Sequence, residues 1–368
     1  MNRKRTVVIC IVVGLISFIG YKCNSMAQEK IDYIFNPELE MIKNGYEGNI
    51  TIDGIFCNGL TKDKAPTGKV IKWKLSSNPQ QKEKKEDKFS LDVVIDTSFQ
   101  NNNDDLIVWL GHSSFFMRIK GVTYITDPIM SNLPTSKRKV SNPYEISTLG
   151  KIDYILISHA HFDHFDITTL KEIVKKNPET EILGPMGINK LLDDKEFESI
   201  KTQEAGWFQK FDTGNLNEIV FLPAKHWHRR NLFDFNKVLW GGFGVRAGDL
   251  KIYFAGDTAK EDDFFNQINE IYNGFDICMI PIGAYSPQFL MKDEHVNPEE
   301  AIGVFQQVKG RYFIPMHYGT YDLSDEPLGE PIKRLNNHAS EKGLKDKMLN
   351  LAVGESLYLN PFFQLTNQ

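Results

Sequence analysis

Short apolar runs, each bounded by polar or turn-forming residues, recur along the chain from residue 105 onward. Runs of this length suit buried β-strands, and they predict strands at 106–109, 115–119, 122–126, 154–157, 181–184, 219–222, 251–255, 276–281 and 312–315. Helical spacing predicts a helix over 167–176, and a short helix is expected at 187–192. Another helix begins near Asn297, because asparagine is a favoured N-cap, Pro298 fits the first turn and Glu300 occupies the capping-box position.

The N-terminus has the pattern of a targeting segment. Three basic residues at 3–5 precede an apolar run at 7–21, and small residues follow at 25–27. These features predict a cleaved export signal over residues 1–27, with an uncleaved membrane anchor as the alternative. Either interpretation places the protein in the cell envelope, as a periplasmic or membrane-associated protein.

Residues 28–104 are polar and only weakly periodic. We expect them to form an N-terminal arm that packs on a catalytic domain of residues 105–368. The mixed charge run at 82–88 (KEKKEDK) is expected to be a solvated loop.

The composition narrows the class of protein. With 368 residues, 41% hydrophobic and 25% charged, the chain can form one large α/β domain or two smaller ones. A net charge of −5 argues against a general nucleic-acid binder, whose domain should be basic. The four cysteines are too few and too scattered for a disulfide framework, and none forms a Cys-x-x-Cys pair. Any metal would therefore be held by histidine and carboxylate.

The segment DYILISHAHFDHFD at 153–166 carries the strongest chemical signal. A predicted strand ends there in His159, His161, Asp163 and His164, which are four potential metal ligands within six positions. Imidazole nitrogen and carboxylate oxygen are ligands that zinc accepts. A purely structural explanation would require three imidazoles and a carboxylate packed together without a function, so we expect a metal site.

Single candidates follow later predicted strands. His226, Asp257 and His317 each follow the end of one within four residues. His228 is an alternative to His226 because side chains two apart share a face of an extended chain. Asp127 also ends a strand. It is either an outer partner that orients a metal-bound histidine or a turn-forming Asp-Pro residue.

The pattern His-x-His-x-Asp-His resembles that of the metallo-β-lactamase-fold hydrolases. This resemblance implies a four-layer αββα sandwich with two Zn²⁺ ions per chain. It assigns His159, His161 and His226 to one ion, Asp163, His164 and His317 to the other, and Asp257 to a bridging position between them. Two such cations lower the pKa of a shared water, so that hydroxide is available at neutral pH.

Further blocks resemble one branch of that fold. WLGH at 109, KHWHRR at 225, VLWGG at 238, FAGDT at 254, PIGAYSPQFLMK at 281, HVNPEEA at 295 and MHYGTY at 316 are similar to N-acylphosphatidylethanolamine-hydrolysing phospholipase D over residues 106–358. The resemblance implies cleavage of a phospholipid at a membrane surface, to phosphatidic acid and an N-acylethanolamine, by a homodimer. No nucleic-acid partner is expected.

The same resemblance implies roles beside the metals. His295 would hold or polarise the substrate and take part in catalysis. Phe162 would contact substrate where the animal enzyme has a tyrosine, and Glu294 replaces a glutamine of that enzyme. The alternative reaction is that of a lactonase or small phosphate-ester hydrolase of the same fold.

Overall fold

Two seven-stranded sheets form the centre of the protein. The structure is a computed structural model and describes residues 29–214 and 217–366. The first sheet has the order β10 (Thr202–Ala205), β9 (Glu181–Pro185), β8 (Tyr154–Leu156), β7 (Val122–Thr126), β6 (Ser114–Ile119), β5 (Leu106–Gly111) and β17 (Ser356–Tyr358). The second has the order β16 (Gly310–Met316), β15 (Phe275–Pro281), β14 (Leu250–Phe254), β13 (Gly242–Ala247), β12 (Glu218–Leu222), β11 (Gln209–Lys210) and β2 (Glu40–Met41).

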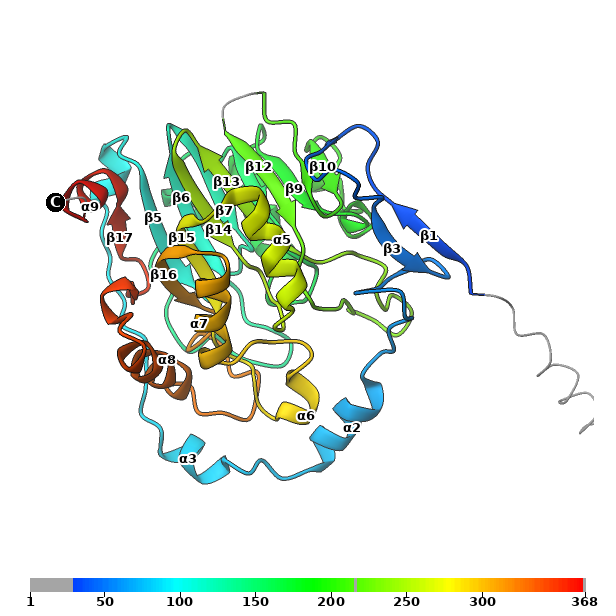
Figure 1. Cartoon of the computed structure of the whole chain (residues 1–368). Helices are drawn as coiled ribbons and strands as arrows, with labels where there is room; N and C mark the ends of the chain where they lie inside the picture. The colour runs from blue at the N-terminus through cyan, green and yellow to red at the C-terminus, as the bar shows by residue number, and fades with distance from the viewer. Residues whose placement is uncertain (1–28, 215–216, 367–368) are drawn as a thin grey trace, which may run out of the picture.

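The sheets pack face to face, and helices cover their outer faces (Figure 1). Aromatic rings fill the space between the sheets, where the ring of Phe115 lies 6.4 Å from that of Phe254. Helix α4 (Ile167–Lys176) covers the first sheet, with Leu170 and Ile173 fully buried against it. Helices α5 (Asp262–Tyr272), α7 (Pro298–Gln307) and α8 (Glu330–Glu341) lie on the side of the second sheet. This arrangement confirms the predicted αββα sandwich.

The N-terminal residues reach both the sheets and the helices. Strands β1 (Ile31–Ile34), β3 (Asn49–Ile52) and β4 (Ile55–Phe56) form a small sheet of their own, whereas β2 is hydrogen-bonded to β11 of the second sheet. Helices α2 (Thr67–Leu75) and α3 (Gln81–Glu86) follow along the outside of the molecule (Figure 1). The predicted loop at 82–88 is wrong over α3, because glutamate and lysine are good helix formers even where nothing is buried.

The other predicted elements agree closely with the structure. All nine predicted strands are present, with ends displaced by at most two residues, and α4 has the predicted bounds. The capping box at Asn297 is also present, while the helix expected at 187–192 is a short 3₁₀ turn, Ile188–Leu191. Short 3₁₀ turns also occur at Ser98–Asn101, Ile146–Thr148, Lys195–Phe197 and Lys345–Lys347, and the remaining helices are α6 (Gln288–Met291) and α9 (Leu359–Thr366).

The predicted export segment, 1–27, lies outside the described residues, and no described helix is both long and apolar enough to cross a bilayer.

Candidate metal centre

The seven predicted ligands meet at one edge of the sandwich, between the two sheets. The first sheet supplies four of them from the turn after β8, and the second supplies His226, Asp257 and His317 after β12, β14 and β16. Gly256 shapes the turn before Asp257. It has a φ of +62°, and a Cβ there would lie 2.5 Å from the carbonyl oxygen of Gly241. The two sheets therefore both contribute to the same site.

Three imidazoles form the first group of donors. Nδ1 of His161 lies 3.0 Å from Nε2 of His159 and 3.0 Å from Nε2 of His226. A single proton on His161 cannot satisfy both neighbours. A cation bound by all three nitrogens would satisfy them together, so this geometry fits a metal.

The second group contains a residue that the sequence reasoning missed. One donor atom from each of His112, Asp163, His164 and His317 lies within 4.8 Å of the others. Nε2 of His112 lies 3.0 Å from Oδ2 of Asp163, and the His112 ring is 4.1 Å from that of His317. The sequence does place this histidine in a Gly-His-Ser turn after the strand that became β5, but no role was assigned to it from the sequence.

Asp257 lies between the two groups. Its Oδ2 is 3.1 Å from Nε2 of both His164 and His317, 3.9 Å from Nε2 of His159 and 4.0 Å from Nε2 of His226. A carboxylate that reaches ligands of both groups has the position that a bridging ligand requires.

Outer partners fix the direction in which the histidines face. Nδ1 of His164 donates to Oδ2 of Asp127 at 2.7 Å, and Nδ1 of His226 donates to the carbonyl oxygen of Glu294 at 2.9 Å. Each proton on Nδ1 leaves the Nε2 lone pair directed into the centre. The outer-partner interpretation of Asp127 is therefore the one that its contacts favour.

The two donor groups differ in protonation: the three-imidazole group is ready to bind a cation, whereas a cation at the second group must displace the proton of His317. Burial lowers the pKa of His161 and of His226 to about 3, so both rings are neutral and can act as ligands. Burial alone raises the pKa of Asp257, but His164 and the other surrounding imidazoles lower it more, and the net pKa is well below the usual range. For His317, burial lowers the pKa, but Asp257 and Asp163 raise it more strongly, to about 9.

Several donor atoms in the centre make no hydrogen bond within the described part of the chain, although two of them lie beside Oδ2 of Asp257. Nε2 of His164, Nε2 of His317 and Oδ1 of Asp257 are all buried without a hydrogen bond. Unpaired buried polar groups destabilise a protein by about 1–3 kcal/mol each. A divalent cation would supply the missing interactions, so the donor set fits a metal.

The remaining predicted residues lie around the centre. Nδ1 of His295 is 3.7 Å from Oδ2 of Asp257, and burial lowers the pKa of His295 to about 3. Phe162 is half exposed, and the guanidinium of Arg230 lies 4.0 Å from the centre of its ring. His228 is buried 6.3 Å from the ring of His161, outside the donor groups, so His226 is the better placed of the two alternatives. The roles assigned to these residues stay predictions.

A pocket of about 480 Å³ opens beside the first donor group. Its lining includes His226 and Glu294, the lysines Lys64, Lys69 and Lys225, and the aromatic residues Trp227 and Phe235. Residues of the N-terminal region form one of its walls. Asp63 and Asp293 also line it, so the pocket joins a cation site to a surface of lysines, carboxylates and aromatic rings.

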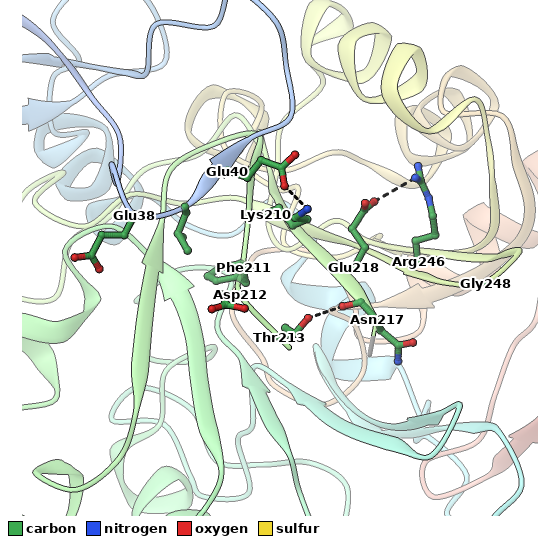
Figure 2. A pocket seen from close by; sticks show the side chains of 11 residues that line it. Glu38, Glu40, Lys210, Phe211, Asp212, Thr213, Asn217, Glu218, Arg246 and Gly248 are labelled. Atoms are coloured by element: carbon green, nitrogen blue, oxygen red, sulfur yellow. Dashed lines mark hydrogen bonds and ion pairs between the residues drawn. The ribbon is translucent and has the colours of Figure 1, made fainter. Parts of the chain in front are cut away.

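A second pocket, of about 560 Å³, lies at the opposite end of the second sheet. Figure 2 shows two ion pairs between its side chains, Lys210 with Glu40 and Arg246 with Glu218. Glu218 begins β12, whereas His226 follows the end of that strand. This second pocket is therefore remote from the metal ligands.

Comparison with known proteins identifies the family of this chain. Residues 123–318, more than half of the chain, match the β-lactamase superfamily domain. The chain is 32% identical to N-acyl-phosphatidylethanolamine-hydrolyzing phospholipase D 1 of Caenorhabditis elegans, over 70% of this chain and 76% of that protein. It is 31% identical to the mitochondrial N-acyl-phosphatidylethanolamine-hydrolyzing phospholipase D of Saccharomyces cerevisiae, over 67% of this chain but only 54% of the yeast protein.

The fold has solved counterparts as well. The metallo hydrolase Igni18 of Ignicoccus hospitalis superposes with a TM-score of 0.52 at 20% identity, over 69% of this chain and 97% of its own. Together with the convergence of the histidines and aspartates on one edge of the sandwich, these matches show that the chain belongs to the metallo-β-lactamase superfamily of metal-dependent hydrolases.

Proposed function

We propose that the protein is a zinc-dependent phosphodiesterase of the phospholipase D type, which cleaves N-acylphosphatidylethanolamine-like lipids to phosphatidic acid and an N-acylethanolamine. One observation carries the proposal: two donor groups share Asp257 beside a pocket lined by lysines and aromatic rings. A phosphodiester with long acyl chains needs both kinds of surface. The two named phospholipase relatives support the same assignment.

Two Zn²⁺ ions would be held by His159, His161 and His226 and by Asp163, His164 and His317, with Asp257 between them. When bound, such ions lower the pKa of a water molecule and stabilise charge on phosphoryl oxygens. Elemental analysis should find about two equivalents of zinc per chain. Full activity without metal after exhaustive chelation would contradict the assignment.

The pocket residues would bind and orient the lipid. Lys64 offers an ammonium group to the phosphate, and Lys225 offers one that is shared with Glu261 at 3.0 Å. Trp227 and Phe235 contact apolar parts of the substrate. Burial raises the pKa of Glu294 to about 8, so this carboxyl is largely protonated at neutral pH and does not repel an anionic lipid. The glutamate at this position is thus compatible with the same substrate class as a glutamine.

His295 would polarise or hold the substrate at the edge of the centre. Its neutral ring faces Asp257, and its Nδ1 is buried without a hydrogen-bond partner among the described residues. A neutral imidazole can donate a hydrogen bond to a phosphoryl oxygen or accept one from a head-group N–H.

Hydrolysis in ¹⁸O-labelled water tests the reaction itself. Synthetic N-acylphosphatidylethanolamine is incubated with the zinc-loaded protein, and both products are analysed by mass spectrometry. Label in phosphatidic acid indicates attack at phosphorus and supports the proposal. Label in a released fatty acid, or cleavage of lactones or small phosphate esters without any phospholipid cleavage, would contradict it and favour the alternative reaction.

Location and assembly stay predictions. The envelope location rests on residues 3–27, which lie outside the described part of the chain. Cell fractionation should recover the protein with the envelope, and an intact, uncleaved chain in the cytoplasmic fraction would contradict this. The homodimer implied by the resemblance can be tested by sedimentation of the purified protein.

A further inference from the structure

Exposed apolar side chains gather around the pocket beside the metal centre. Thirteen large apolar residues are exposed within residues 29–214 and 217–366. Seven of them belong to segments that border the pocket or the metal ligands, and we call these seven the apolar rim: Leu60, Ile71, Leu75, Phe162, Leu232, Phe233 and Phe289. Two adjacent members protrude strongly, since Leu232 is 75% exposed and Phe233 is 90% exposed.

Direct contacts join the segments of the rim. Helices α2 and α6 lie side by side (Figure 1). Nζ of Lys72 on α2 lies 4.6 Å from the centre of the Phe289 ring on α6. Arg229, in the loop that carries Leu232 and Phe233, donates a hydrogen bond from Nη1 to Oγ1 of Thr67 at 2.9 Å. These contacts connect α2, α6 and the Arg229 loop, which carry five of the seven rim residues.

This surface is basic although the protein is acidic. Residues 58–75 contain five lysines and one aspartate, in a chain with a net charge of −5. Lys62 pairs with Asp53 and Lys69 with Asp293. Within the described chain, Lys64, Lys72 and Lys74 have no carboxylate within ion-pairing distance. Lys72 and Lys74 instead lie over the rings of Phe289 and Trp73, which leaves their charge without a carboxylate partner.

We propose that the apolar rim docks on an anionic lipid bilayer, with Leu232 and Phe233 inserted among the acyl chains and the lysines of α2 on the head groups. The inference rests on the proposed phospholipase function, because a bilayer at the rim places lipids at the mouth of the pocket. Apolar side chains flanked by unpaired lysines are the pattern of interfacial membrane binding. A second copy on the same face would bring like charges together, because a twofold interface uses the same patch twice.

Tryptophan quenching tests the contact directly. We would prepare Phe233→Trp and the control Ile95→Trp, since Ile95 is 71% exposed and lies outside the rim. Each zinc-loaded full-length protein is mixed with vesicles of phosphatidylcholine and 30% phosphatidylglycerol that carry bromine on the acyl chains. Quenching relative to the unsubstituted protein is expected at position 233 and not at position 95. Equal quenching at both positions, or none at 233, would overturn the proposal.

Binding and kinetics test the consequence. Leu232→Ser/Phe233→Ser should weaken vesicle binding at least about tenfold, whereas Val94→Ser/Ile95→Ser should not. Neutralising Lys72 and Lys74 to glutamine should weaken it about fivefold for each lysine, with a smaller effect in high salt. Because every variant keeps residues 1–28, only differences between variants are compared. Hydrolysis of a short-chain lipid below its micellar concentration should be unchanged by the serine substitutions.

The outcomes separate the docking surface from the reaction. Quenching at position 233 without cleavage of any phospholipid would overturn the proposed function and support the surface. Cleavage of vesicle lipid with position 233 unquenched would overturn the surface and support the function. Self-association of the protein that Phe233→Ser abolishes would assign the rim to a second copy and overturn the proposal.

Discussion

Replacing Asp127 by asparagine tests whether an outer carboxylate holds His164 as a metal ligand. Asp127 is fully buried. Its Oδ2 accepts hydrogen bonds from Nδ1 of His164 at 2.7 Å and from the Ser158 hydroxyl at 2.5 Å, and its Oδ1 accepts one from the Ser158 backbone at 2.7 Å. Asparagine keeps the size of the side chain and one oxygen. It removes the negative charge and one of the two acceptors.

The size of the effect follows from these contacts. A hydrogen bond to a charged group contributes about 1.5–3 kcal/mol and a neutral one about 0.5–1.5 kcal/mol, so the lost charge accounts for about 1–1.5 kcal/mol. That difference corresponds to roughly five- to tenfold in affinity. The amide can also turn its NH₂ toward His164, which disturbs the ring further. Since loss of an outer partner typically weakens metal binding about 10–100-fold, we expect zinc to bind about 10–30-fold more weakly.

The assay is a zinc titration of chelator-stripped protein against a chromophoric competitor, with thermal unfolding followed in parallel. Asp153→Asn is the matched control, because Asp153 accepts two hydrogen bonds from Thr123, at 2.8 and 2.7 Å, at the opposite end of β8 from the ligands. Zinc affinity of the control should stay within about twofold of the unsubstituted protein. Unchanged affinity in Asp127→Asn, or equal losses in both variants, would refute the reasoning.

Three further predictions concern the centre and its surroundings. Asp257→Asn should lower kcat by on the order of a hundredfold or more, while circular dichroism shows that the protein still folds. Near-normal turnover would show that Asp257 is not part of the site. In Glu294→Gln, the free energy of unfolding should depend less on pH than in the unsubstituted protein. Burial raises the pKa of Glu294 from 4.5 to about 8. The native carboxyl therefore contributes stability that is present below about pH 4.5 and is lost as the pH rises toward 8. The same change in the free energy of unfolding in both proteins between pH 5 and 8 would contradict this. Phe162→Tyr should leave turnover of N-acylphosphatidylethanolamine unchanged or raise it by up to about tenfold, the value of one hydrogen bond, and a clear loss in steady-state assays would refute the predicted substrate contact.

The strands and the metal motif could be predicted because their signals are local. A run such as the one before His159 specifies a buried strand by itself, and four donors within six residues specify a site. Strand β13 was not predicted, because its sequence GFGVRA is interrupted by glycine, which is usually unfavourable in strands. The structure supplies the reason for one of them: a Cβ on Gly244 would lie 2.4 Å from the hydroxyl oxygen of Tyr272 on α5.

Contacts between distant segments could not be predicted from local patterns. His112 precedes the metal motif by about fifty positions, and only the pairing of β5, β6, β7 and β8 brings it to Asp163. The backbone carbonyl of Glu294 that orients His226 is likewise invisible in a sequence, since every residue has a carbonyl group. The apolar rim combines α2, the Arg229 loop and α6, which are more than fifty residues apart along the chain.

The metal centre also explains how the two sheets are held at this edge. His164 belongs to the first sheet and His317 to the second, and both face Oδ2 of Asp257 at 3.1 Å. Without a cation, the edge buries one oxygen of Asp257 and two imidazole nitrogens that make no hydrogen bond, which opposes closure of the sandwich. With a cation, the same atoms become ligands that tie the sheets together. Metal binding would therefore be coupled to closure of this edge, because the donors follow β8 in one sheet and β14 and β16 in the other.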